Sequence, residues 1–486
     1  MAQPDPPPVR TTSEMHGEAT LVASSTSPSH AGSKQGHGNG HGQGEGQEQG
    51  QSNSSAYNDA TATTRARAGH PLFADKARGI RLRALRFTSS WFSVTMGTGI
   101  VNTLLFLLPW RSSHAAFRAI GCAFLLLDMV LFAAFTVLTI ARYTLYPRIF
   151  MAMLRHETHS LFLGCIPMGF VTIVSGIAAT GHEYGLNTLD TALVLYWISV
   201  AMSILTAFGV PFVMFTQHQH AAETMTAAWL LPIVPLITEA AVGSTLCKLL
   251  LLEGRTTYCL TLFIASYLCG GIGMLLAAAV IVLYLQRLIL HHLPPREVIV
   301  SSWLPVGPIG QGGFAIIELG HVAVDLFPRL AADKPYLAQL GHPMLGAAVL
   351  IGLLLWGLGI WFAFLAIVSI AAQFRRTKTG TGTAVFNMGW WAFTFPLGSL
   401  NLLTISLATV FDAMFFKVCA TIMTFSVLTL WAVVFVPTTV GFFRGTLFAA
   451  PCLQALPPKY VEKLAPAAGG DALRKEEGRA EEGLRP

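Results

Sequence analysis

The amino-acid sequence predicts an all-α integral membrane protein. Hydrophobic residues make up 53% of its 486 residues and charged residues only 12%, and the mean hydropathy is +0.56. A typical soluble domain carries about twice that share of charged residues. Apolar stretches recur between residues 88 and 440. They reach the ~20 residues that a helix needs to cross the hydrocarbon core, about twice the length of a membrane-spanning strand.

We predict ten transmembrane spans. They cover residues 88–108, 115–143, 160–180, 191–216, 225–247, 256–290, 298–325, 343–373, 385–410 and 414–440. An even number of spans places both termini on the same side of the bilayer. Loops and flanks on that side carry more Lys and Arg than the opposite loops, so the positive-inside rule predicts that both termini are cytoplasmic.

Three regions follow from this pattern. Residues 1–85 are polar and rich in Gly, Ser, Gln and His, which predicts a disordered cytoplasmic N-terminal tail. Residues 86–445 are predicted to form a ten-helix transmembrane domain, and residues 446–486 a cytoplasmic C-terminal tail with runs of mixed charge. The net charge of +6 is scattered over short loops, which argues against nucleic acid as a partner.

The odd-numbered spans share a repeat. In each, a bulky aromatic residue precedes a helix breaker by five or six positions: Phe162 and Pro167, Trp303 and Pro308, Trp391 and Pro396, Trp229 and Pro235, and Trp91 and Gly97. Irregular backbone in a membrane is tolerated where it contacts protein or a water-filled cavity. We therefore predict five helical hairpins, with five broken odd helices in an inner ring around a central pore. The alternative is that these prolines and glycines only kink helices for packing.

The pore hypothesis names candidate residues. The helix breaks that would line the pore are Gly97, Gly99, Pro167, Pro232, Pro235, Pro305, Pro308 and Pro396. The candidate ionisable pore residues are Glu239 and Glu318, because carboxylates inside a membrane are often functional. Asp128 is more simply a structural residue of an outer helix. Beside Pro396 stand the candidate gate residues Phe393 and Phe395.

The chemistry of these residues favours a weakly bound small anion. Neither an acidic ring nor a basic ring is present, and helices that restart after a break offer backbone N–H groups to an oxyanion. These residues do not distinguish an anion from a neutral solute. The seven cysteines show no Cys-x-x-Cys spacing, and no Walker, triad or zinc motif occurs, so we predict no enzyme activity, no metal site and no cofactor. His218 and His220, in a predicted cytoplasmic loop, are candidate pH sensors.

Six strings resemble the tellurite-resistance and dicarboxylate transporter family, which includes malic acid permeases, plant slow anion channels and sulfite exporters. They are residues 90–100, 160–170, 223–235, 293–301, 307–314 and 387–398. The strings Pro-Pro-Arg-Glu-Val at Pro294 and Gly-Gln-Gly-Gly-Phe at Gly310 favour the sulfite-exporting branch. The resemblance covers nearly all of residues 87–453 and neither tail.

The resemblance implies ten helices as five hairpins, a homotrimer with one pore per protomer, and a phenylalanine of the ninth helix that plugs the pore. The Trp-Trp-Ala-aromatic-x-Phe-Pro pattern assigns that plug to Phe395, with Phe393 as the second choice. Glu318 stands where glutamine is expected in the sulfite branch, and an added carboxylate would disfavour a dianion.

The expected function is efflux of sulfite or hydrogen sulfite across the plasma membrane. The alternative within transport is a malate or C4-dicarboxylate permease, or a less selective anion channel of the same family. A different class of function is a non-transporting sensor or scaffold whose histidine-rich tail binds partners.

Overall fold

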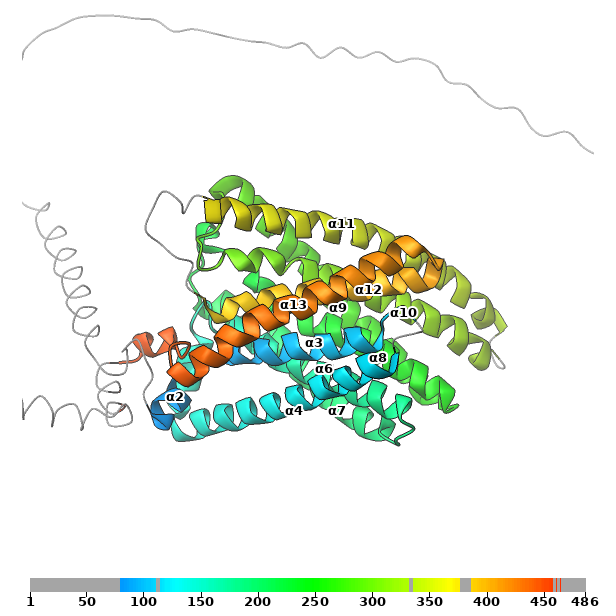
Figure 1. The fold of residues 1–486 in the computed structure, drawn as a ribbon, viewed down its shortest axis with the longest axis horizontal. Coiled ribbons are helices and arrows are strands. Elements are labelled where there is room, and N and C mark those ends of the chain that lie inside the picture. The colour runs from blue at the N-terminus through cyan, green and yellow to red at the C-terminus, as the bar shows by residue number, and fades with distance from the viewer. Residues whose placement is uncertain are drawn as a thin grey trace, which may run out of the picture. The chain divides into compact units, whose positions relative to one another are not determined.

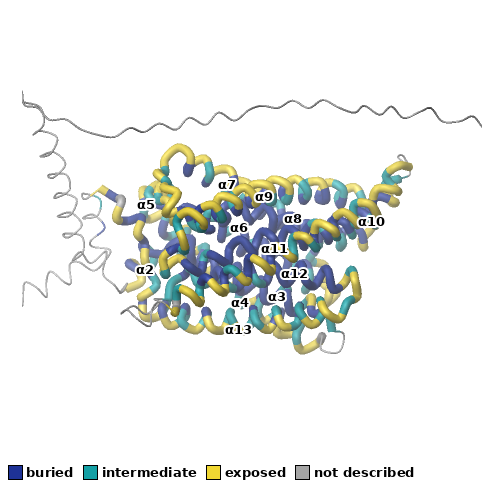
Figure 2. Tube along the Cα trace, turned by 90° about the horizontal axis from the view of Figure 1, so that it is seen from above, coloured by how far each residue is buried: buried dark blue, intermediate teal, exposed yellow. Residues whose placement is uncertain are grey.

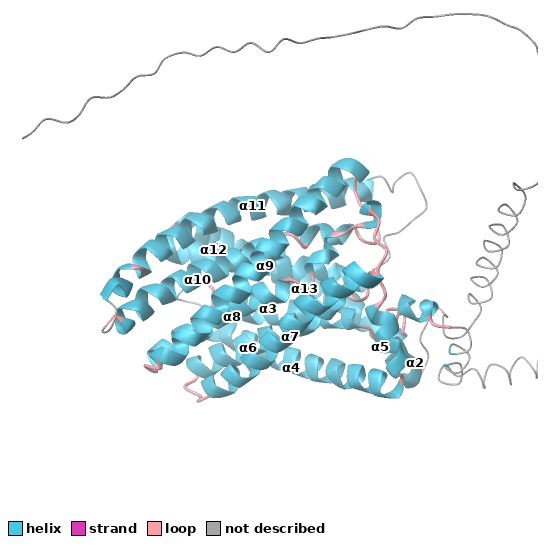
Figure 3. Cartoon of the chain, turned by 180° about the vertical axis from the view of Figure 1, so that it is seen from behind, coloured by secondary structure: helices cyan, strands magenta, loops and turns pink. Residues whose placement is uncertain are grey.

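The computed structural model describes residues 79–110, 114–331, 335–375 and 386–457, together with Tyr460 and Leu464. Within these residues the chain forms helices joined by loops and contains no strand (Figure 3). This confirms the all-α class. The predicted N-terminal tail lies outside the described residues up to residue 78, and so does most of the predicted C-terminal tail.

Five helices share one plan, in which a short 3-10 helix leads into an α-helix. They are η2 (Ser89–Trp91) with α3 (Phe92–Phe106), η4 (Leu161–Gly164) with α6 (Cys165–Glu183), η6 (Ala227–Leu230) with α8 (Val234–Leu252), η7 (Ile299–Trp303) with α10 (Val306–Leu330), and η10 (Met388–Phe393) with α12 (Thr394–Phe411). These five coincide with the odd-numbered predicted spans. We call α3, α6, α8, α10 and α12 the inner helices.

The even-numbered predicted spans form five longer helices, which we call the outer helices. They are α4 (His114–Leu145), α7 (Leu189–Gln217), α9 (Thr256–His291), α11 (Gly341–Arg375) and α13 (Met414–Arg444). Two short helices, α2 (Ile80–Arg86) and α5 (Pro147–Leu154), lie at one end of the bundle (Figure 3).

The inner helices form a closed ring. Each one packs against the outer helix that follows it in the chain, and contacts also run from α3 to α6, α8, α10, α12 and back to α3. Figure 1 shows these helices side on, running along the length of the bundle. The most apolar windows of α6, α8 and α12 are 72%, 89% and 78% buried, whereas those of the outer helices are 17–39% buried. In Figure 2 the buried residues occupy the middle of the bundle. The outer helices thus present their apolar side chains outward.

Eight helices among the described residues are long and apolar enough to cross a membrane. They are the five outer helices and three inner ones, α6, α8 and α12, each taken with any adjoining 3-10 turn. The outward-facing apolar residues of the outer helices include Val130, Leu205, Leu275, Leu354 and Val436. Since such surface is stable in lipid and unfavourable in water, the chain is a multi-pass membrane protein.

The prolines lie elsewhere in the inner helices than we predicted. Pro167, Pro308 and Pro396 are each the third residue of an α-helix, and Pro235 is the second residue of α8. The first four N–H groups of a helix have no intrahelical partner, so a proline there removes no helical hydrogen bond. The interruption is the change from 3-10 to α-helix before the proline, and these prolines leave no carbonyl unpaired in mid-helix.

Hydrogen bonds support these junctions. At the start of η10 the Asn387 side chain accepts a bond from the Gly389 N–H at 2.8 Å. Around the start of α8, the N–H groups of Leu231, Ile233 and Leu236 donate to carbonyls three residues earlier, at 2.9–3.2 Å. Because these donors are already paired, the expectation that free backbone N–H groups solvate the permeant is not supported at this junction.

Candidate functional site

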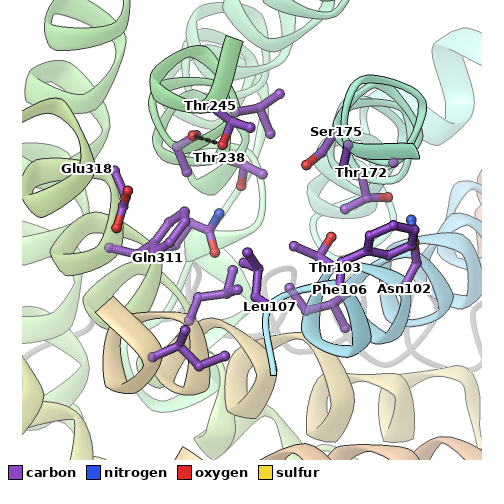
Figure 4. Close-up of a pocket in the computed structure, with 18 of the residues that line it drawn as sticks. Asn102, Thr103, Phe106, Leu107, Thr172, Ser175, Thr238, Thr245, Gln311 and Glu318 are labelled. Carbon is purple, nitrogen blue, oxygen red and sulfur yellow. Dashed lines mark hydrogen bonds between the residues drawn. The ribbon is translucent and has the colours of Figure 1, made fainter. Parts of the chain in front are cut away.

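A cavity of about 270 Å³ lies inside the ring of inner helices. Its walls come from α3 with the following Leu107 and from α6, α8, α10 and α12 (Figure 4), and among the described residues no outer helix contributes to the lining. On α12 the lining runs from Phe395 in the first turn to Thr409 in the last. A water molecule takes up about 30 Å³ in the liquid, so the cavity has room for a small ion with part of its hydration shell.

Two ionisable residues line the cavity, and they form an ion pair. The Lys248 ammonium of α8 contacts Glu318 Oε2 of α10, and the Ser406 hydroxyl of α12 donates to Glu318 Oε1. The side chain of Glu318 is 13% exposed and that of Lys248 is 41% exposed. Three inner helices are therefore tied together at one charge-compensated point.

Two buried amides at the cavity lack hydrogen-bond partners. The two polar side-chain atoms of Asn102, Nδ2 and Oδ1, and the Oε1 atom of Gln311 are buried without a hydrogen-bond partner among the described residues. The two residues are 1% and 3% exposed, and both line the cavity (Figure 4). Buried polar groups of this kind call for water or a ligand. Gln311 Oε1 is thus an unpaired acceptor in the cavity wall, whereas Asn102 Oδ1 lies beside Gly121 of the outer helix α4.

The two candidate gate residues take different positions. Phe395 lines the cavity from the first turn of α12 and is 2% exposed. Phe393, at the end of η10, is half-buried and packs against Trp303 and Trp390, with ring centroids 6.0 and 5.9 Å apart. Of the two, only Phe395 lines the cavity.

The predicted helix breaks lie outside the cavity lining. Gly97, Gly99, Pro167, Pro232, Pro235, Pro305, Pro308 and Pro396 are all buried and absent from the residues that line it. A Cβ on Gly97 would overlap Thr394 Oγ1 and lie 2.6 Å from the Trp391 ring, and one on Gly99 would overlap Thr172. These two glycines allow helices to approach closely.

The other two acidic residues considered, Glu239 and Asp128, lie away from the cavity. Glu239 of α8 is fully buried and turns toward α7, where Ser199 and Ser203 donate to its Oε1 at 2.6 and 2.8 Å. Asp128 of α4 is also fully buried, and Thr172 lies 3.4 Å from its Oδ2. Neither carboxylate lines the cavity, whereas Glu318 does.

Sequence reasoning missed Lys248, Asn102 and Gln311. We assigned Lys248 to a loop because the predicted span ended at residue 247, but α8 continues to Leu252. The signal was present as helical spacing, since Thr238, Thr245 and Lys248 recur on one face of α8 and all three line the cavity. Nothing in the sequence marks Asn102, because amides are common at helix contacts. Gln311 lies in the Gly-Gln-Gly-Gly-Phe string, which pointed to the family and not to a role for this side chain.

A group of histidines lies at one end of the bundle. The rings of His156 and His159 have centroids 4.7 Å apart, and those of His218 and His220 are 5.3 Å apart. Burial lowers the pKa of His159 to about 3, and the nearby His156 and Arg142 act in the same direction. Burial also lowers the pKa of His220. His159 is thus uncharged near neutrality, and pH sensing by His218 and His220 stays a prediction.

Comparison with known proteins identifies the family of this chain. The family model SLAC1, described as a voltage-dependent anion channel, matches residues 86–439. The sulfite efflux pump SSU1 of Arthroderma benhamiae is 38% identical over 356 residues, which cover 72% of this chain and 90% of the relative. The malic acid transport protein of Schizosaccharomyces pombe is 26% identical over 342 residues, which cover 69% and 74%. Because the family match spans well over half of the chain, this protein belongs to the SLAC1 family of voltage-dependent anion channels.

Proposed function

We propose that this protein exports sulfite or hydrogen sulfite across the plasma membrane through an anion pathway gated by Phe395. The observation that carries the proposal is one cavity lined by all five inner helices, with a compensated charge pair and unpaired amides in its wall. A pathway without excess fixed charge binds an anion weakly and releases it quickly. The 38% identity to a sulfite efflux pump supports sulfite as the substrate.

The proposed architecture has ten membrane crossings arranged as five hairpins around the pathway, with both termini in the cytoplasm. The closed ring of inner helices and the contact between each inner helix and the following outer helix support it. Here α3 and α10 also cross the bilayer, shielded from lipid by the outer helices. We further propose a homotrimer with one pathway per protomer. The pathway needs no cofactor and no metal.

The proposed gate acts by steric and dielectric exclusion. An aromatic ring in a narrow pathway displaces the water that an anion needs, which raises the barrier to passage. Phe395 sits where α12 begins, directly before Pro396, and the proline restricts the backbone that carries the ring. In this proposal the prolines and glycines shape the inner helices, while side chains contact the anion.

A flux assay tests the substrate. The purified full chain is reconstituted into liposomes loaded with radiolabelled sulfite, and efflux is compared with that from protein-free liposomes. We expect sulfite efflux above the protein-free level and little malate efflux. Malate efflux without sulfite efflux would favour the C4-dicarboxylate permease, for which the relative named as a malic acid transport protein is the specific support. Transport of neither anion would favour the sensor or scaffold.

Replacement of the gate residue tests the mechanism. Phe395→Ala removes the ring from the cavity and should raise the resting anion flux about tenfold or more, since a tenfold change needs only about 1.4 kcal/mol of barrier. The matched control is Phe393→Ala, which removes a ring that does not line the cavity. Unchanged flux in a folded Phe395→Ala protein, or an equal leak in both variants, would exclude Phe395 as the gate.

A further inference from the structure

The charged residues of the cavity bear on the charge that the transported anion carries. Lys248 and Glu318 are the only ionisable residues among those described as lining it, and they neutralise each other. Both oxygens of Glu318 are occupied, one by the Lys248 ammonium of α8 and the other by the Ser406 hydroxyl of α12. His321, one turn after Glu318 on α10, is the further titratable group that interacts with this carboxylate. The two charges that line the cavity cancel, so its lining carries no net charge.

A wall without net charge discriminates between anions of different charge. The cost of removing an ion from water grows with the square of its charge, so a dianion loses about four times the hydration free energy of a monoanion of equal size. A free cation in the wall would offset that loss. Lys248 does not supply one, because Glu318 already neutralises it.

An unpaired amide oxygen discriminates in the same direction. Gln311 lines the cavity, and its Oε1 is a hydrogen-bond acceptor buried without a partner among the described residues. A fully deprotonated oxyanion can only accept hydrogen bonds, so it would leave this oxygen unpaired. A protonated oxyanion carries an O–H that can donate to it.

From these observations we infer that the cavity selects a singly charged, protonated oxyanion, hydrogen sulfite rather than the sulfite dianion, and that the Lys248–Glu318 pair determines this selectivity. The inference rests on the proposed function and adds the charge state of the substrate. Each transported ion then carries one proton with it.

The test measures efflux of radiolabelled sulfite and sulfate from liposomes containing the full chain, over a pH range that spans the second ionisation of sulfurous acid. Sulfate remains a dianion throughout this range. We expect wild-type sulfite flux to fall about tenfold per pH unit above that ionisation, as the protonated fraction does. Sulfate flux should stay at the level of protein-free liposomes.

Charge variants test the role of the pair. Glu318→Gln leaves Lys248 uncompensated, so the fall of sulfite flux with pH should become less steep and sulfate flux should appear. The double variant Lys248→Met/Glu318→Gln removes both charges and should restore the exclusion of sulfate. It is the matched control, because it shares the Glu318 substitution and differs in net charge. His321→Gln should keep the steep fall, because the titrating proton belongs to the substrate.

The outcomes separate the two proposals. Absence of sulfite flux at every pH would overturn the proposed function and the inference with it. Sulfite flux that does not fall with pH, or wild-type transport of sulfate, would overturn the inference alone. So would a folded Glu318→Gln protein that still excludes sulfate, and so would loss of the pH dependence in His321→Gln.

Discussion

Glycines on one face of α10 determine how closely it approaches α12. Gly307, Gly310 and Gly313 recur every third residue. A Cβ on Gly310 would overlap the backbone of Leu400, and one on Gly313 would lie 2.6 Å from the Leu403 side chain. Backbone cannot move aside as a flexible side chain can, so Gly310 is the most constrained of the three. This contact helps to hold Gln311 and Glu318 of α10 opposite α12.

Gly310→Ala should therefore destabilise the protein. Overpacking of a close helix contact typically costs about 1–3 kcal/mol, and here the overlap is with backbone. Thermal unfolding of the purified protein in detergent measures the effect. The control is Gly357→Ala on α11, where an added Cβ meets no atom within 4 Å. Equal unfolding temperatures for the two variants would contradict the close contact.

Asp128, Glu239 and Glu318 show how much the sequence predicts about a single acidic residue in a membrane span. Their type and depth could be predicted, because an acidic residue within an apolar stretch is visible in the sequence. Their roles could not. Glu239 bonds to two serines of α7, whereas Glu318 meets Lys248 at the cavity. The difference is the direction in which each side chain leaves its helix, and that depends on which helices are neighbours.

At the scale of the element, the junction between 3-10 and α-helix repeats five times. Aromatic side chains anchor it. Trp391 of η10 is fully buried, and its Nε1 donates to Thr438 Oγ1 of α13 at 3.0 Å. Its ring packs against Gly97 of α3, where a Cβ would overlap it. Trp91, at the end of η2, stacks on Phe87 with ring centroids 5.8 Å apart. The spacing between aromatic residue and breaker thus reflects a turn followed by the first residues of a helix.

Replacement of the proline tests this description of the junction. Pro396→Ala should change the free energy of unfolding by less than about 1 kcal/mol, because a proline in the first turn replaces no hydrogen bond. Ala408→Pro, in the interior of the same helix, should cost about 3 kcal/mol or more. Chemical unfolding in detergent compares the two. A loss with Pro396→Ala as large as that with Ala408→Pro would mean that the proline holds the helix open.

At the scale of the whole molecule, the division into inner and outer helices accounts for the composition. The outer helices expose apolar side chains such as Leu275 and Leu354, which lipid solvates. The inner helices hold more of the buried polar residues than the outer helices do, including Asn102, Thr238 and Asn401. Polar groups are thereby kept out of lipid and near the cavity or one another, as expected where unsatisfied groups are costly.

The orientation of the bundle can be tested by labelling. The positive-inside rule places the loop at Glu157 in the cytoplasm and the loop at Asn187 outside, and both residues are exposed. In a background where the two half-exposed cysteines, Cys122 and Cys419, are serine, Asn187→Cys should react with a membrane-impermeant maleimide on intact cells. Glu157→Cys should react only after permeabilisation. The reverse pattern would invert the proposed topology and the direction of the gate.

Hydropathy and periodicity alone establish that this is an all-helical membrane protein. They also place the helices within a few residues and distinguish the five that follow an aromatic turn. These are local properties, because a stretch of about 20 apolar residues enters lipid as a helix whatever its neighbours are. Glu318 could be selected for the same reason, as an acidic residue within such a stretch. The choice of Phe395 depended on its place beside Pro396 and on the family resemblance.

Only the tertiary structure brings Asn102, Lys248 and Gln311 to the wall of one cavity with Phe395 and Glu318, and turns Glu239 away from it. They come from four inner helices, α3, α8, α10 and α12, which are separated along the chain by outer helices. They come together because the glycine-rich faces of the inner helices pack against one another. This packing cannot be predicted from any one stretch of the sequence. The charge balance of the cavity, and with it the kind of anion that we infer, therefore follows from packing.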